Sequence, residues 1–300
     1  MAEGVIFDVK RMSIDDGPGF RTVAFLKGCP LRCIWCHSPE SMYAKPELVF
    51  YESRCIGCGR CIESCPTDVY RVSEAHSRVI VRERCIACGK CARECYAGAL
   101  DIKGTIMSSR DLYAELVKDK VFYEVSRGGV TFSGGEPMFQ PEFLLDTLRM
   151  CKAGGIHTAV DTSGYAKDYV VQELMPYVDL FLYDLKCMDE EKHKQYTGVS
   201  NAMILGNLRM LAEGGKEIHI SVPAIPGFNT SFENVAQTMR LMRDLEIRTM
   251  RLLSFNKMAG SKYEWQGRSF PLEDIIPMGE EWSTRVKELG AEFNIDVILK

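Results

Sequence analysis

Residues 28–37 read Gly-Cys-Pro-Leu-Arg-Cys-Ile-Trp-Cys-His and decide how the rest of the chain is interpreted. Within them, Cys29, Cys33 and Cys36 follow the spacing C-x3-C-x2-C. Three thiolates at this spacing can hold three corners of a [4Fe–4S] cube, whose full set of ligands is four cysteines. The fourth iron stays open, as one position stays open in catalytic zinc sites. The stretch therefore predicts a working cluster rather than a closed structural one.

Two other interpretations fit the same spacing. Positions i, i+4 and i+7 share one face of a helix, so the three cysteines could be core residues, and a zinc site is the second alternative. Gly28 and Pro30 disfavour a helix that begins before Cys33. The remaining cysteines of the chain agree better with the cluster.

Composition restricts the class of protein. The 300 residues suffice for one large and one small domain, and 46% hydrophobic and 26% charged residues are ordinary for a globular protein. The net charge of −4 and the lack of a long basic run disfavour nucleic-acid binding. No apolar run approaches the ~20 residues of a membrane span, and the first residues do not form a signal peptide. We expect a cytoplasmic protein in which the 13 cysteines serve mainly as metal ligands.

An internal repeat supplies eight of these cysteines. Residues 54–65 and 84–95 each carry the run C-x2-C-x2-C-x3-C. This run resembles that of bacterial two-cluster ferredoxins, in which the fourth cysteine binds the other cluster. The resemblance implies one [4Fe–4S] cluster on Cys55, Cys58, Cys61 and Cys95 and a second on Cys85, Cys88, Cys91 and Cys65. Paired zinc knuckles are the alternative. Tyr96 stands where the ferredoxin run has a proline.

Beyond the repeat, helices and strands alternate. We expect strands at residues 4–10, 22–26, 129–132, 156–160, 180–183, 217–222, 249–253 and 293–299. We expect helices at residues 109–123, 141–153, 167–175, 202–213, 232–245 and 279–289. Six strand–helix units predict an α/β fold, an incomplete (β/α)6 barrel over residues 1–50 and 104–300, with the ferredoxin-like domain inserted at 51–103. Nearly every polar cluster follows a strand, which is where such barrels place their chemistry.

The three-cysteine loop, with an aromatic residue before its third cysteine, resembles the S-adenosylmethionine (SAM) site of radical SAM enzymes. The turn Gly134-Gly135-Glu136-Pro137 resembles the motif with which that superfamily holds the amino group of SAM. The resemblance makes Cys29, Cys33 and Cys36 the catalytic cluster ligands. It implies SAM contacts at Trp35, Cys36, His37, Gly134, Gly135, Glu136, Asp184, Leu185, Lys186 and Asn256.

Two further strand ends carry carboxylates. In the similar pyruvate formate-lyase activating enzymes, the matching segments hold a monovalent cation, Na+ or K+. That resemblance implies cation ligands at Asp161, Thr162, Asp184 and the Leu182 carbonyl, since hard oxygen ligands suit such ions. Helix capping is the alternative for Asp161. Where the family has a histidine this chain has Asn256, and where it often has an arginine the chain has Ser221. We expect His76, His157, His193 and His219 to be ordinary surface or core residues.

The segment Asp16-Gly17-Pro18-Gly19-x-Arg21 resembles the opening signature of glycyl-radical-enzyme activating enzymes, although a simple turn also explains it. This resemblance implies reductive cleavage of SAM to a 5′-deoxyadenosyl radical that takes a hydrogen atom from a glycine of a partner enzyme. It implies three [4Fe–4S] clusters, SAM, a flavodoxin or ferredoxin as reductant, and a monomer. The alternatives are a radical SAM enzyme with auxiliary clusters that acts on a peptide or small molecule, and a non-catalytic electron carrier.

Overall fold

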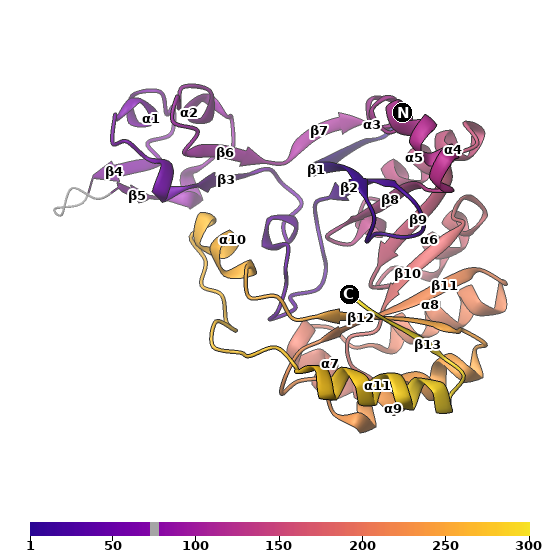
Figure 1. Ribbon diagram of the computed structural model, residues 1–300. Coiled ribbons are helices and arrows are strands. Elements are labelled where there is room, and N and C mark those ends of the chain that lie inside the picture. The colour runs from indigo at the N-terminus through magenta and orange to yellow at the C-terminus, as the bar shows by residue number, and fades with distance from the viewer. Residues whose placement is uncertain (73–77) are drawn as a thin grey trace.

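The computed structural model describes residues 1–72 and 78–300. His76, which we expected to be an ordinary residue, lies outside the described part. Figure 1 shows a large curved sheet with helices on its outer side and a small separate lobe that contains the cysteine repeat. No helix in the described part is long and apolar enough to cross a membrane.

The sheet has nine strands in the order β13-β12-β11-β10-β9-β8-β2-β1-β7. Seven adjacent strands are parallel: β2 (Arg21–Leu26), β8 (Gly129–Gly134), β9 (His157–Thr162), β10 (Leu180–Asp184), β11 (Glu217–Ala224), β12 (Thr249–Ser254) and β13 (Asp296–Leu299). The long β1 (Glu3–Ser13) runs antiparallel to β2 and to β7 (Thr105–Ser108). The eight predicted strands are all present.

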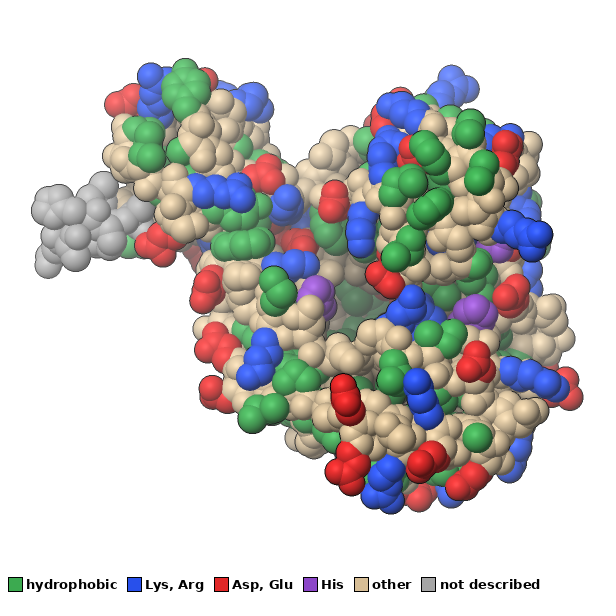
Figure 2. All heavy atoms as spheres, in the orientation of Figure 1, with side chains coloured by type: hydrophobic (Ala, Val, Ile, Leu, Met, Phe, Trp, Pro, Cys, Tyr) green, Lys and Arg blue, Asp and Glu red, His purple; other side chains and the backbone are tan. Residues whose placement is uncertain are grey.

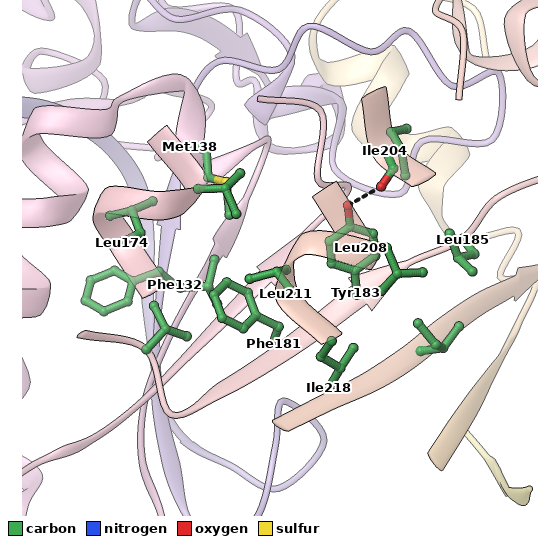
Figure 3. Packing of buried hydrophobic residues seen from close by; sticks show 14 of the residues in the cluster. Phe132, Met138, Leu174, Phe181, Tyr183, Leu185, Ile204, Leu208, Leu211 and Ile218 are labelled. Carbon is green, nitrogen blue, oxygen red and sulfur yellow. Dashed lines mark hydrogen bonds between the residues drawn. The ribbon is translucent and has the colours of Figure 1, made fainter. Parts of the chain in front are cut away.

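Helices cover the outer face of the parallel strands and bury the core between the two layers (Figure 1). They are α5 (Pro141–Ala153), α6 (Asp168–Leu174), α8 (Ala202–Glu213), α9 (Phe232–Asp244) and α11 (Glu280–Glu292). Figure 3 shows the packing around Tyr183, which is fully buried and whose hydroxyl donates to the Ile204 carbonyl at 2.6 Å. This bond satisfies the one polar atom that the ring brings into the core.

The helix predicted for residues 109–123 is wrong in one respect, since it is broken. It consists of α3 (Ser109–Leu116), a 3-10 turn (Val117–Asp119) and α4 (Lys120–Ser126). Asp119 turns inward at the break, where its carboxylate accepts from the Thr22 hydroxyl at 2.6 Å. The Tyr123 hydroxyl donates to the Leu116 carbonyl at 2.8 Å, which satisfies a carbonyl at the end of α3.

The lobe with the cysteine repeat, called the insert below, contains two short antiparallel strand pairs and two one-turn α-helices among its described residues (Figure 1). Strands β3 (Glu47–Phe50) and β6 (Leu100–Lys103) pair at its base, and β4 (Tyr70–Val72) pairs with β5 (Arg78–Ile80). The helices are α1 (Arg60–Glu63) and α2 (Lys90–Arg93). Leu48, Val69 and Leu100 form its apolar core together with cysteine side chains.

Residues 14–20, which we call the plug loop, connect β1 to β2 and reach across to β12. Arg251 on β12 donates to the Asp15 carbonyl at 2.5 Å, and Lys300 pairs with the Asp15 carboxylate at 2.9 Å. On the other side, Arg21 donates to the Thr131 hydroxyl at 2.6 Å and to the Pro18 carbonyl at 3.2 Å. The plug loop therefore joins strands from both halves of the open sheet, which is more than a simple turn would do.

Candidate functional site

A cavity of about 460 Å³ lies where the parallel strands end. Figure 2 shows that the molecule is hollowed near the centre of one face. The predicted site residues that line the cavity are Cys29, Cys33, Trp35, Cys36, His37, Gly134, Gly135, Asp161, Thr162, Asp184, Lys186 and Asn256. The cavity also includes Asp16 of the plug loop and Ser133, which the sequence analysis did not select. Segments up to 240 residues apart in the chain thus meet at one site.

The three-cysteine stretch, residues 28–37, forms an irregular loop, called the cluster loop, rather than a helix. The backbone N–H groups of Arg32 and Ile34 donate to the carbonyls of Thr197 and Tyr196 at 2.7 and 3.0 Å. The latter two residues end α7 (Glu190–Thr197), a polar helix that we did not predict. The Trp35 ring is 7% exposed and packs against Tyr196. These contacts hold the cluster loop against the end of α7.

Burial raises the pKa of the three thiols of the cluster loop. It raises the pKa of Cys29 and Cys33 to about 12 and that of Cys36 to about 11. Ligation of iron requires thiolates, so cluster binding here would release protons. The donor set suits an iron–sulfur cluster, because three thiols border one cavity that has room for a further ligand.

The turn after β8 lies directly against the cluster loop. The N–H of Gly135 donates to the Leu26 carbonyl at 2.8 Å, and that of Glu136 donates to the Gly28 carbonyl at 2.9 Å. A Cβ atom on Gly135 would overlap the Gly28 carbonyl oxygen. Glycine is needed here because the two backbones approach too closely for any side chain.

Glu136, predicted as a SAM contact, does not line the cavity. Its carboxylate is buried and accepts from Thr162 Oγ1 at 2.7 Å, from Ser163 N and Oγ at 2.9 and 2.6 Å, and from Met138 N at 3.1 Å. Burial raises the pKa of this carboxyl, and the hydrogen bonds from Ser163 and Thr162 oppose that rise. Glu136 thus fastens the end of β8 to the end of β9 behind the cavity wall.

Asp161 and Asp184 end neighbouring strands and face the cavity. Asp161 accepts from the Ser133 hydroxyl at 2.7 Å, and Asp184 pairs with the Lys186 ammonium at 2.7 Å. Burial and the nearby charge of Asp184 raise the pKa of Asp161 to about 7. Asp161 does not cap the next helix, because α6 begins after Lys167, so the capping alternative is wrong.

Of three other residues predicted to bind SAM or the cation, one lines the cavity and two do not. Asn256 lines the cavity and accepts from the Met258 N–H at 2.9 Å. Leu185 and Leu182 are 4% and 0% exposed and do not line it. Both leucines are core residues of β10 and the turn after it, which an apolar strand pattern already indicates.

A buried asparagine that we did not predict as a site residue holds two strand ends together. Asn229 Nδ2 donates to the carbonyls of Lys186 and Pro223 at 2.7 and 2.6 Å, and its Oδ1 accepts from Ile225 N at 2.8 Å. Lys186, Pro223 and Ile225 all line the cavity. The Pro-Gly-x-Asn turn was the available signal, because asparagine side chains often bond nearby backbone.

An arginine lies near Asp161, but it comes from β12 and not from β11, where similar enzymes often have one. Ser221 on β11 lies beside Arg251 on β12, and Arg251 Nη1 donates to the Ser221 hydroxyl at 3.2 Å. The positive charge of Arg251 lowers the pKa of Asp161, against the larger effects of burial and Asp184.

The insert brings its eight cysteines together in the crossed sets expected from the ferredoxin run. One small cavity is lined by Cys55, Cys58, Cys61 and Cys95, and another by Cys65, Cys85, Cys88 and Cys91. These sets surround cavities and are not sites for a single ion: within the described residues, no three His, Cys, Asp or Glu side chains form a group that could hold one metal ion.

Comparison with protein families defines the class of the protein. The model of the radical SAM superfamily matches residues 84–248, and the model of the 4Fe-4S dicluster domain matches residues 47–96. The chain therefore belongs to the radical SAM superfamily, has its α/β fold with a parallel sheet, and carries a ferredoxin-like dicluster domain.

Individual relatives narrow the class to one family. The chain is 40% identical to a trans-4-hydroxy-L-proline dehydratase activating enzyme of Clostridioides difficile, over 98% of each chain. It is 38% identical to a choline trimethylamine-lyase activating enzyme of Oleidesulfovibrio alaskensis, over 98% of this chain and 97% of the other. A solved domain of a pyruvate-formate lyase-activating enzyme from Bacteroides vulgatus has 31% identity and a TM-score of 0.50, and covers 58% of this chain and 99% of that one. The chain is a member of the glycyl-radical-enzyme activating enzymes, which are oxidoreductases.

Proposed function

We propose that the protein activates a partner glycyl radical enzyme at the cavity between the cluster loop and the strand ends. The single observation that carries this is the meeting of three thiols, two glycines, three carboxylates and one lysine around a 460 Å³ cavity. When bound, a reduced [4Fe–4S] cluster with an open iron supplies the electron that splits SAM into methionine and a 5′-deoxyadenosyl radical. The radical takes a hydrogen atom from one glycine of the partner.

The chain's own residues bind and orient SAM and exclude water. Cys29, Cys33 and Cys36 hold the cluster, and the backbone of Gly134 and Gly135 receives the methionine part. The Lys186 ammonium meets the SAM carboxylate, while Trp35, His37 and Asn256 line the remainder of the cavity. Because Glu136 is sequestered by four donors, its role is to hold the Gly-Gly turn rather than to touch SAM.

A monovalent cation fits between Asp161 and Asp184, with Thr162 and the Leu182 carbonyl as further expected ligands. Burial raises the pKa of Asp161 to about 7, and the nearby charge of Asp184 adds to that rise; a cation between the two carboxylates would oppose both effects. Thr162 lines the cavity, whereas Leu182 is buried inside β10 and is the weakest member of the set.

The number of strand–helix units in the barrel and the number of clusters are also part of our proposal. Six strand–helix units beginning at β2 form an incomplete (β/α)6 barrel over residues 1–50 and 104–300, with β13 added at its end. Residues 51–103 hold two further [4Fe–4S] clusters, which makes three in all. Their crossed cysteine sets line separate cavities, as two clusters require. Free thiols in such number fit a reducing compartment, so we place the protein in the cytoplasm.

The partner is a glycyl radical enzyme, and the reductant is a flavodoxin or ferredoxin; the activase itself acts as a monomer. The relatives are named as activating enzymes of a dehydratase and of a lyase, which act on different substrates. The partner is therefore proposed only as a class, the glycyl radical enzymes. The two insert clusters either relay electrons or shape the docking surface. Cys55→Ser separates these roles: if one insert cluster is lost and SAM cleavage and activation stay complete, the relay is excluded.

The function is tested by anaerobic reconstitution with iron and sulfide, reduction with dithionite, and assay of 5′-deoxyadenosine after SAM is added. We expect about twelve irons per chain, for three four-iron clusters, and SAM-dependent deoxyadenosine that is lost in Cys33→Ala. About eight irons without deoxyadenosine would instead support the electron-carrier alternative. Deoxyadenosine without radical formation on any glycyl radical enzyme, but with a modified peptide or metabolite, would support the other alternative.

A further inference from the structure

Helix α10 (Ala259–Trp265) lies between the insert and the cluster loop and contacts both (Figure 1). Toward the insert, the Trp265 ring packs edge-on against Tyr51 with centroids 4.8 Å apart, and Arg82 donates to the Trp265 carbonyl at 3.0 Å. Toward the cluster loop, Tyr263 belongs to the same buried apolar cluster as Trp35. The position of α10 relative to the cluster loop is therefore fixed from two sides.

Lys262 on this helix makes two contacts with the cluster loop and the turn that follows it. Its ammonium donates to the His37 carbonyl at 3.1 Å and pairs with Glu40 Oε1 at 3.2 Å. His37 directly follows the cluster ligand Cys36, and Glu40 is three residues further along.

The Glu40 carboxylate lies in an unusual environment. Its side chain is 13% exposed, and its Oε2 atom is buried without a hydrogen-bond partner among the described residues. A mostly buried carboxylate that is only partly satisfied depends strongly on its counter-charge, because the local dielectric is low. Lys262 supplies that charge beside the cluster ligand.

We infer that Lys262 is a positioning residue of the cluster held by Cys29, Cys33 and Cys36, and that the Lys262 and Glu40 charges act in opposite directions on the cluster's reduction potential. The inference rests on the proposed function. Reduction adds one negative charge to the cluster, taken in the test from dithionite. The Glu40 carboxylate opposes that added charge and the Lys262 ammonium favours it, so the pair offsets most of its own field.

The pair offers a test that a purely structural role would not pass. If the ion pair only ties α10 to the cluster loop, the loss of either partner breaks the same contact and moves the potential in the same direction. If its charges act on the cluster, Lys262→Met lowers the potential and Glu40→Gln raises it. Lys262→Arg keeps the charge and restores the value of the unaltered protein.

The measurement is an anaerobic redox titration of the reconstituted full-length chain, followed by electron paramagnetic resonance. Only the part of the signal that changes on addition of SAM is analysed, because the insert clusters have no open iron. We expect Lys262→Met to reduce the ratio of reduced to oxidised cluster about tenfold at a fixed potential, which corresponds to 59 mV for one electron. Lys287→Met removes an exposed lysine on α11 and serves as the control, for which we expect no shift.

Opposite shifts in Lys262→Met and Glu40→Gln support the inference. Shifts in the same direction, or no shift in either variant, overturn it and leave the proposed function intact. If the unaltered protein has no SAM-responsive signal, the proposed function and the inference both fail.

Discussion

Ser163 donates both its backbone N–H and its hydroxyl to the same oxygen of the Glu136 carboxylate, at 2.9 and 2.6 Å. Thr162 and Met138 occupy the other oxygen, at 2.7 and 3.1 Å. One buried carboxylate thus closes the turn after β8 onto the turn after β9. Because both turns line the cavity, this contact determines where the Gly-Gly backbone lies.

Glu136→Gln is expected to disrupt this contact despite its similar shape. An amide brings an NH2 group to face two donors, so at least one buried group loses its partner, at a cost of about 2 kcal/mol or more. We expect a lower unfolding temperature and loss of deoxyadenosine formation. Glu142→Gln, on the exposed side of α5, is the control. An unchanged unfolding temperature for Glu136→Gln would contradict the role assigned here.

Gly164→Ala tests the packing of the turn after β9 against β10. Gly164 has φ of +71°, and a Cβ atom there would overlap the Tyr183 hydroxyl. Gly155 has a similar φ of +67°, and no atom lies within 4 Å of the position that its Cβ would occupy, so Gly155→Ala measures the backbone strain alone. We expect about 1 kcal/mol of destabilisation for Gly155→Ala and about 2–4 kcal/mol for Gly164→Ala. Denaturant unfolding of both variants checks this, and equal losses would contradict it.

The raised pKa of Asp161 predicts that cation binding depends on pH. The pKa of about 7 in the folded chain exceeds the ordinary 3.8, so this carboxyl favours folding most below about pH 4, and that contribution is lost as pH rises to 7. The proposed cation between Asp161 and Asp184 would bind the ionised form, so we expect its stabilisation to grow as pH rises through 7.

The measurement compares unfolding temperatures in KCl or NaCl with those in choline chloride at equal ionic strength. We expect a larger gain from K+ or Na+ at pH 8 than at pH 6, and none in Asp161→Asn at either pH. Asp244→Asn, at an exposed position, should respond like the unaltered protein. A gain that is independent of pH would exclude Asp161 as a ligand.

Asn229→Ala should weaken SAM binding without loss of iron. The substitution removes the two donors that hold the Lys186 and Pro223 carbonyls and the acceptor for Ile225 N. Lys186 then loses its fixed position, and we expect the KM for SAM to rise about tenfold, since one lost buried hydrogen bond costs roughly 1–3 kcal/mol. Gln237→Ala, on the exposed side of α9, is the control. An unchanged KM would show that Asn229 does not position Lys186.

Much of the site was predictable because its signals are local. Ligand spacing placed Cys29, Cys33 and Cys36 at one cavity, and the repeated quartet placed the insert cysteines at two others. Apolar periodicity predicted the bounds of α5 and α8 without error. Asp161 and Asp184 followed from the rule that parallel strands end at one edge of the sheet.

The remainder depends on contacts between distant segments. α7 is mostly polar, and its last turn is held by backbone bonds to the cluster loop rather than by an apolar face. Glu136 belongs to a motif that predicts a ligand contact, and the motif does not reveal that its carboxylate accepts hydrogen bonds from Thr162 and Ser163 on the next strand and turn. Lys262 lies 225 residues from His37 in the chain, and no local pattern identifies such a pair.

The distance along the chain between His37 and Lys262 affects the order in which their contact forms during synthesis. During synthesis, the cluster loop leaves the ribosome 225 residues ahead of the lysine that binds its His37 carbonyl. At about 5–20 residues per second, this interval lasts on the order of 10 to 45 seconds. Throughout that time the cluster loop lacks its contacts with α10. Iron and sulfide delivered after the last helices have docked would meet a cluster loop that already has all of its contacts within the chain.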